Sequence, residues 1–545
     1  MVEAVPPFIG DDSFLLSAIR RLAIYGLATR DPGLNRERIA RMEQLYNGFV
    51  ASLSFTNFFA CFIGVLIGTI IGVLPGLGPT ATLTLMLPFT LKYAPETGLI
   101  MMAGCWFGAQ YGGSTTSILV NIPGESASVV TCIDGYQMAK KGRAGAALAV
   151  VAAGSFIAGT MGIVGLQFFA PLLGNWALSM GPPEYLGFLV LAFLILTALS
   201  GDSPVKGFLM LGIGLWMSMV GLSAMDSVPR FTFGSRNLMM GIDFLPLAVG
   251  LFGVTEVLVT AAEKYVPPVL EKIRFRDLYP NREEIRRSVA PALRGSVLGF
   301  FVGLLPGPCA VISTFLSYAV EKKISKTPEK FGTGMIEGVV APESANNSAV
   351  MGAMIPLLTL GIPFSPSAAV MMAALEMHNV DVGPLLFQNY SQIFWTFIAA
   401  MYIGNFMLLV LNLPLVGFFA RIATIRPFLL MPFISIICLL GVYSVRNSFF
   451  DVWVMIAAGA VGVFFRKYGH PVAPLIIGLV LGPMVENNIR KTLMMFRGDF
   501  LLIFDRPLAL VFFGLALVLV LFKLGYPYVF RSPGMLPKGD GDSME

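Results

Sequence analysis

Two clusters of polar side chains lie inside long apolar stretches of this sequence, and their types suit the binding of a small anion. They carry hydroxyl and amide groups: Ser114, Thr115, Thr116, Asn121, Asn346, Asn347, Thr359 and Ser365. Such groups can hydrogen-bond a carboxylate, and N–H groups at the start of a helix add partial positive charge. These eight residues are therefore the candidate substrate-binding residues.

The same side chains have a structural alternative. Ser and Thr can donate to carbonyl groups of their own helix. Asn can hydrogen-bond between neighbouring helices, a contribution of roughly 1 kcal/mol. The sequence leaves this alternative open for each residue. Because both clusters lie beside interruptions of an apolar run, the pattern as a whole favours a substrate-binding role for the clusters.

Two acidic residues, Glu125 and Glu343, lie beside the same interruptions. Carboxylates inside a membrane usually serve function, so either could bind Na⁺ or carry H⁺, which makes both candidates for ion coupling. A solvated or helix-capping role is the alternative for each. The motifs contain no Lys or Arg, so dipoles, amides and a co-bound cation would hold an anion, which favours cation coupling.

No resident cofactor or metal is expected, apart from a transported Na⁺. His378 and His470 are isolated in the sequence, and the five cysteines show no CxxC or Cys/His ligand spacing.

Proline and glycine interrupt the apolar runs beside the polar clusters. The candidate helix-break or gating residues are Pro75, Gly76, Pro123, Gly124, Pro306, Gly307, Gly361 and Pro363. An interrupted helix leaves backbone groups unpaired, which a bilayer tolerates only against protein or a water-filled cavity. Paired interruptions of this kind point to a substrate site near the middle of the membrane.

The interruptions belong to an internal repeat. The segment "GVLPGLGPTATL" begins at Gly72, and "GLLPGPCAVIST" begins at Gly303. Further on, an Ile-Pro pair follows ten residues after both Gly112 and Gly352. The chain therefore consists of two related halves.

The repeat is asymmetric in its polar residues. Asn121 corresponds to Gly361, and Asn346-Asn347 corresponds to Trp106-Phe107. The polar groups are thus distributed between the halves, as one shared site would require.

Charge placement indicates that the two halves are inverted. The basic loop "MAKKGR" follows the Ile-Pro segment in the first half, whereas "EKKISKTPEK" precedes that segment in the second. Basic loops tend to face the cytoplasm. Exchanged basic loops therefore predict opposite orientations in the membrane.

The composition requires lipid as a solvent. Hydrophobic residues make up 56% of the 545 residues and charged residues 13%, against about 25% charged in a soluble domain. The net charge of +5 lies in short basic loops and indicates membrane orientation, not nucleic-acid binding. We expect an all-α polytopic membrane protein with about 11–14 membrane segments, broken or re-entrant helices and two inverted halves.

Five regions are expected along the chain. Residues 1–50 form a cytoplasmic or interfacial extension, unless translation begins at Met42. The first transmembrane repeat covers 51–261, a basic cytoplasmic linker 262–294, and the second repeat with C-terminal helices 295–524. A polar tail covers 525–545.

Several motifs resemble one family of membrane proteins. "YGGSTTSILVNIPGE", "APESANNSAVMGAMIPLLTLGIP", "GVLPGLGPTATL", "DGYQMAKKGRAGAAL" and "SVPRFTFG" are similar to signatures of the TctA family, the large membrane subunit of bacterial tripartite tricarboxylate transporters. The resemblance extends from roughly Met42 to Lys523. It implies a multi-pass secondary transporter of the bacterial cytoplasmic membrane that imports small carboxylates by ion-coupled symport. It also implies two partners, a small four-helix membrane subunit (TctB-like) and a periplasmic solute-binding protein (TctC-like).

Two other classes of function remain as alternatives. A membrane-embedded enzyme would need a paired Asp, a Ser/His set or a HExxH motif on facing helices, and the sequence shows no such spacing. A passive anion channel would need no coupling ion. We therefore expect a transporter and not an enzyme.

Overall fold

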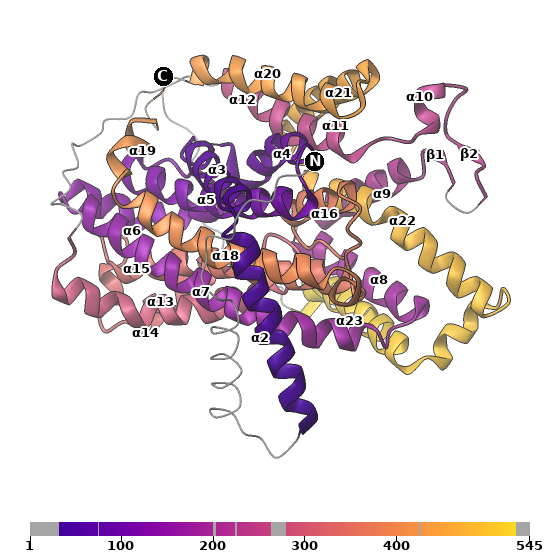
Figure 1. Ribbon diagram of the computed structural model, residues 1–545, viewed down its shortest axis with the longest axis horizontal. Helices are drawn as coiled ribbons and strands as arrows, with labels where there is room; N and C mark the ends of the chain where they lie inside the picture. Colours follow the sequence, from indigo (N-terminus) through magenta and orange to yellow (C-terminus); the bar gives the residue numbers. More distant parts are fainter. Residues whose placement is uncertain are drawn as a thin grey trace, which may run out of the picture.

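The computed structural model describes residues 32–74, 76–199, 203–223, 226–262, 279–422, 425 and 427–529. These residues form a helical bundle (Figure 1), which confirms the expected all-α polytopic fold. The strands within them are the short antiparallel pair β1 (Gly221–Leu222) and β2 (Pro229–Arg230). The expected terminal segments, residues 1–50 and 525–545, lie largely outside the described residues.

The helices before the central linker are α2 (Pro32–Ser52), α3 (Phe55–Gly72), α4 (Gly78–Thr90), α5 (Pro95–Val120), the 3₁₀ turn η1 (Ser126–Ser128), α6 (Val129–Lys140), α7 (Ala144–Ala177), α8 (Pro182–Leu199), α9 (Pro204–Ser218), α10 (Arg236–Met239), α11 (Phe244–Ala248), the π-helix η2 (Val249–Val254) and α12 (Thr255–Ala262). Within the expected linker, residues 282–294 form the beginning of the next helix, α13.

The later helices are α13 (Arg282–Gly303), α14 (Cys309–Ile324), the 3₁₀ turn η4 (Pro328–Lys330), α15 (Glu337–Leu360), α16 (Pro366–Met377), α17 (Leu386–Asn389), α18 (Ser391–Asn412), α19 (Val416–Ile422), α20 (Pro427–Arg446), α21 (Phe449–Lys467), α22 (Val472–Met495), the 3₁₀ turn η5 (Phe500–Asp505) and α23 (Pro507–Val529).

Eight helical segments in the described part of the chain are long and apolar enough to cross a membrane. They are Phe55–Gly72, Ala144–Ala177, Pro182–Leu199, Phe244–Ala262, Ser391–Asn412, Phe428–Arg446, Phe449–Lys467 and Val472–Met495. Many of their outward side chains are exposed aromatic and aliphatic groups, such as Phe168, Phe433 and Trp453. Such a surface is stable in lipid, so the chain is a multi-pass membrane protein.

The repeat seen in the sequence appears as two helix pairs with the same packing. Helices α3 and α5 lie side by side, as do α13 and α15 (Figure 1). A Cβ added at Gly68 would lie 2.3 Å from the carbonyl oxygen of Cys105, and one at Gly299 would lie 2.2 Å from that of Ala345. Small residues spaced by four form one face of a helix, which lets two backbones touch.

The close contact repeats along both pairs. Added Cβ atoms would meet a carbonyl oxygen of the neighbouring helix within 2.3 Å at four further glycines: Gly64, Gly72, Gly295 and Gly303. Both glycine faces end directly before a Pro-Gly interruption. The packing thus fixes the point from which each interruption begins.

The long helices α5 and α15 end in the same way. Their C-terminal caps, Asn121 and Gly361, have positive φ angles of 57° and 69°. Gly and Asn are the residues that most readily adopt this left-handed conformation. Four residues later, Glu125 and Ser365 are both extended and precede the next helical turn. The two halves thus share one backbone design at the break.

Candidate functional site

A cavity of about 730 Å³ lies where the interruptions of both halves meet. The two Pro-Gly breaks contribute residues 76–81 and 307–308, and the two Ile-Pro breaks contribute residues 123–125 and 365–367. Ligand pockets commonly have volumes of about 300–1,000 Å³. The cavity is therefore large enough for a small organic molecule.

The breaks are joined to one another by hydrogen bonds. The hydroxyl oxygens of Thr80 in the first half and Ser367 in the second are 2.8 Å apart. Within the second half, the N–H of Gly307 donates to the carbonyl oxygen of Phe364 at 2.9 Å. Backbone groups released by one break are thus partly satisfied by another, as a membrane interior requires.

Glu125 borders the cavity and contacts the second half. Its Oε1 accepts a hydrogen bond from the amide Nδ2 of Asn346 at 2.6 Å. The amide oxygen of Asn346 is buried without a protein hydrogen-bond partner. The pair presents a carboxylate at the cavity and an acceptor oxygen beside it.

Glu343 is a buried carboxylate on α15 that contacts the first half. Ser114 donates to its Oε2 at 2.5 Å, and Thr131 donates to its Oε1. The amide of Asn347 donates to the Glu343 backbone carbonyl and to the Ser155 hydroxyl, both at 2.9 Å. Burial of a carboxylate is tolerable only with such donors or with a bound cation or proton.

The structure places the candidate substrate-binding residues in different environments. Ser365 lines the cavity and caps α16 by accepting from the N–H of Ala368. Ser114, Asn346 and Asn347 lie outside the cavity lining and belong to the carboxylate contacts just described.

The other four candidates lie away from the cavity lining. Thr116 donates to the carbonyl oxygen of Gly113, and Thr359 donates to that of Ile355, which are contacts within their own helices. Thr115 borders a much smaller pocket beside Ser114. The exposed Asn121 forms the left-handed cap of α5.

The candidate helix-break or gating residues also lie in different environments. Four of them line the cavity: Gly76, Pro123, Gly124 and Gly307. Pro306, Gly361 and Pro363 are buried and do not belong to its lining. Pro75 lies outside the described residues. An added Cβ at Gly124 would lie 2.4 Å from the Cα of Gly113, so only glycine fits where the break folds back on α5.

Sequence reasoning missed several cavity residues. Trp106 and Gln110 come from α5, Glu256 from α12, Arg466 from the end of α21, and His470 follows it. Glu256 and Arg466 form an ion pair. They lie outside the repeated motifs, and no pattern in the sequence connects residues 210 positions apart.

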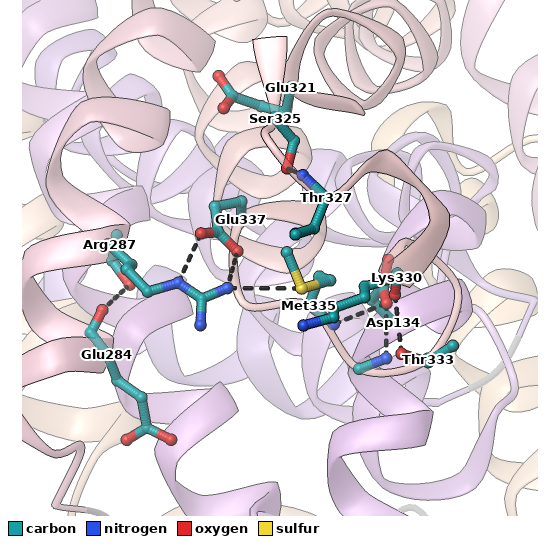
Figure 2. Close-up of polar contacts among 12 residues, drawn as sticks. Asp134, Glu284, Arg287, Glu321, Ser325, Thr327, Lys330, Thr333, Met335 and Glu337 are labelled. Atoms are coloured by element: carbon teal, nitrogen blue, oxygen red, sulfur yellow. Dashed lines mark hydrogen bonds and ion pairs between the residues drawn. The ribbon is translucent and has the colours of Figure 1, made fainter. Parts of the chain in front are cut away.

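A buried carboxylate at Asp134 on α6 organises the loop before α15 (Figure 2). It accepts from the backbone N–H groups of Gly332, Gly334 and Met335, and from the hydroxyl of Tyr318 at 2.9 Å. Asp134 belongs to the "DGYQMAKKG" motif. That motif therefore ties the first half to the loop that precedes α15.

Beside this loop, ion pairs join α13 to its neighbours. Arg287 donates to both carboxylate oxygens of Glu337 at 2.7 Å (Figure 2). Arg294 pairs with Glu321 in the same two-pronged geometry.

Among the described residues, no group of three or more His, Cys, Asp or Glu side chains is arranged to hold a metal ion. The oxygen atoms around Glu125, Glu343 and Asn346 belong to carboxylates, hydroxyls and an amide. Such hard donors suit Na⁺ in their chemistry, and the carboxylates also suit H⁺.

Fold and cavity together define a multi-pass membrane protein with a ligand-sized cavity between two repeated sets of broken helices. The chain belongs to the tripartite tricarboxylate transporter TctA family, whose family model matches residues 58–477. This confirms the resemblance noted in the sequence, and the family is one of transporters.

Two relatives from Agrobacterium vitis support this membership. An uncharacterized 52.8 kDa protein in the TAR-I ttuC' 3' region is 45% identical over 475 residues, which is 87% of this chain and 94% of the relative. An uncharacterized protein in the TAR-II ttuC' 3' region is 42% identical over 226 residues, which is 42% of this chain and 93% of the relative. No solved structure matches the chain.

Proposed function

We propose that this chain is the large transmembrane subunit of a tripartite secondary transporter that imports small carboxylates in the tri- or dicarboxylate class. It acts in the bacterial cytoplasmic membrane with a TctB-like small subunit, and a TctC-like periplasmic protein delivers the substrate. Family membership supports the class of system. The cavity bordered by the breaks of both halves is the observation that carries the proposal.

The cavity suits this role in its shape and its lining. Backbone N–H groups at the breaks can hold an anion, and Ser365 adds a hydroxyl. Glu125 and Glu343 are the coupling residues in this proposal, because each is held by neutral donors that a cation or proton could supplement. Substrate and cation together would lower the charge carried through the membrane.

Transport then requires that the cavity open to each side in turn. Thr80 and Ser367 join breaks of opposite halves through one hydrogen bond. A contact of this strength, about 1 kcal/mol, can be broken and remade during each cycle.

The test is uptake by proteoliposomes that contain the subunit with its small membrane partner, supplied with the binding protein. Citrate, tartrate, succinate and benzoate are offered separately under an imposed Na⁺ gradient and an imposed H⁺ gradient. We expect one of these carboxylates to accumulate above its external concentration under one gradient. Equilibration without accumulation would identify a passive channel, and chemical conversion of the carboxylate would identify an enzyme.

A further inference from the structure

Arg466 gives the cavity a positive charge that the repeated motifs lack. Of the described residues that line the cavity, it is the one arginine, and lysine is absent from the same set. Its side chain is 49% exposed, so the guanidinium remains accessible. Within the described lining, a substrate with two or three carboxylates would therefore find its cationic partner at Arg466.

The packing of α21 explains how Arg466 reaches the cavity. Gly459, Gly462 and Arg466 follow the spacing i, i+3, i+7 and therefore lie on one face of the helix. An added Cβ at Gly459 would lie 2.4 Å from Val254, and one at Gly462 would lie 2.0 Å from Thr255. These two glycines let α21 lie against the π-helix η2 and the start of α12. Arg466 consequently lies beside the next residue, Glu256.

Glu256 occupies the space between Arg466 and the first Pro-Gly break. Its Oε2 accepts from Nη1 of Arg466 at 2.6 Å. Its Oε1 would be 2.3 Å from a Cβ added at Gly76, so this carboxylate oxygen lies directly against the break. Gly76 has a φ angle of 89°, which also requires glycine. The position beside both guanidinium and break is the one that a carboxylate ligand would take.

We propose that Arg466 binds a carboxylate group of the substrate, and that Glu256 holds Arg466 as an internal carboxylate until the substrate replaces it. A guanidinium has five N–H donors, and two of them can bind the two oxygens of one carboxylate. Here Glu256 accepts a hydrogen bond from Nη1. The exchange replaces one charged hydrogen bond by another. This inference rests on the proposed function, because it assigns a ligand to the same cavity.

The proposal predicts opposite effects from removing the two partners. Glu256→Gln removes the internal competitor and lowers the KM for the carboxylate severalfold. Arg466→Gln removes a charge-assisted hydrogen bond and raises KM at least about tenfold. Arg466→Lys keeps the charge next to Glu256 but loses the forked geometry, and so raises KM by a smaller factor. A purely structural ion pair would make all three variants change in the same direction.

The measurement is uptake of radiolabelled citrate, tartrate or succinate by the complete reconstituted complex, whichever the wild type transports. Lys467→Gln, at the next position, and Arg230→Gln, which breaks a two-pronged pair with Glu486 away from the cavity, are the controls and keep the wild-type KM. An unchanged KM in Arg466→Gln, or a raised KM in Glu256→Gln, would overturn the inference while the proposed function stands. A wild type that transports no carboxylate would overturn both.

Discussion

Glu125 and Glu343 each contact polar side chains of the opposite half of the chain. Glu125 of the first half accepts from Asn346 of the second, and Glu343 of the second half accepts from Ser114 and Thr131 of the first. The amide of Asn346 therefore supplies a hydrogen-bond donor to a carboxylate of the first half. A residue that bonds a buried carboxylate cannot be lost cheaply, because the remaining charge loses its donor.

Asn346→Ala tests the contact with Glu125. We expect uptake to be abolished, because the variant removes the amide that donates to Glu125 and the buried amide oxygen beside it. Uptake and size-exclusion chromatography of the complex measure function and assembly separately. Thr359→Ala is the control, since its hydroxyl contacts only the carbonyl of its own helix among the described hydrogen bonds, and it should retain uptake. Normal uptake by Asn346→Ala would remove this residue from the site.

Glu343→Gln tests ion coupling. The amide cannot bind H⁺ as a carboxylate does and holds Na⁺ less strongly, so gradient-driven accumulation should fall at least about tenfold. Exchange of labelled for unlabelled substrate across the membrane should persist, because it needs no net movement of the coupling ion. Glu184→Gln is the control: Glu184 is also buried, but it caps α8 by accepting from the N–H of Gly181. Equal loss of exchange and accumulation in Glu343→Gln would indicate a structural role instead.

At the scale of elements, the repeated pairs α3–α5 and α13–α15 hold the breaks in place. Their glycine faces bring backbone against backbone over three successive turns in each half. At these glycines the two backbones meet without an intervening side chain that could change rotamer. Each break can therefore start from a fixed point.

Gly299→Ala tests this packing. The new Cβ would lie 2.2 Å from the carbonyl oxygen of Ala345, so α13 and α15 must separate. Overpacking of this kind costs about 1–3 kcal/mol, and we expect a lower thermal midpoint of the purified protein in detergent. Gly212→Ala is the matched control on another apolar helix, where an added Cβ meets nothing within 4 Å. An unchanged midpoint in Gly299→Ala would show that the helix pair is adaptable.

The positions of the helix breaks were predictable from the sequence, because closely spaced glycine and proline residues interrupt the apolar runs there. The Pro-Gly and Ile-Pro interruptions, their pairing between halves and the all-α membrane fold follow from residue type and spacing alone. The opposed orientation of the halves stays a prediction, as do the domain boundaries. Asn121 and Gly361, which correspond in the internal repeat, form the same left-handed cap, so the backbone agrees with the repeat.

The composition of the site was harder to predict. Whether a hydroxyl faces a partner or its own helix depends on the rotation of that helix, so Ser114 and Thr116 look alike in sequence but differ in contacts. Glu256 and Arg466 meet only because α21 packs against η2 through glycines. Such a meeting depends on tertiary packing and not on local pattern.

At the scale of the whole molecule, the cavity lies where segments from distant parts of the chain converge. Residues 76–81, 123–125, 307–308 and 365–367 all border it. The first two belong to one half and the last two to the other. Any relative motion of the halves must therefore change the shape of the cavity, which is the requirement for alternating access by rocking or by an elevator motion.

A disulfide between positions 80 and 367 would test this motion by linking the two halves covalently. The hydroxyl oxygens of Thr80 and Ser367 are 2.8 Å apart on α4 and α16, so Thr80→Cys combined with Ser367→Cys should form a disulfide under mild oxidation. We expect the oxidised double variant to lose uptake and a reducing agent to restore it, because a covalent bond replaces a contact that must open. Each single variant under the same oxidation is the control, which also covers the native Cys309 in the cavity lining. Full uptake by the crosslinked protein would show that these two breaks stay together throughout transport, and that the moving boundary lies elsewhere in the bundle.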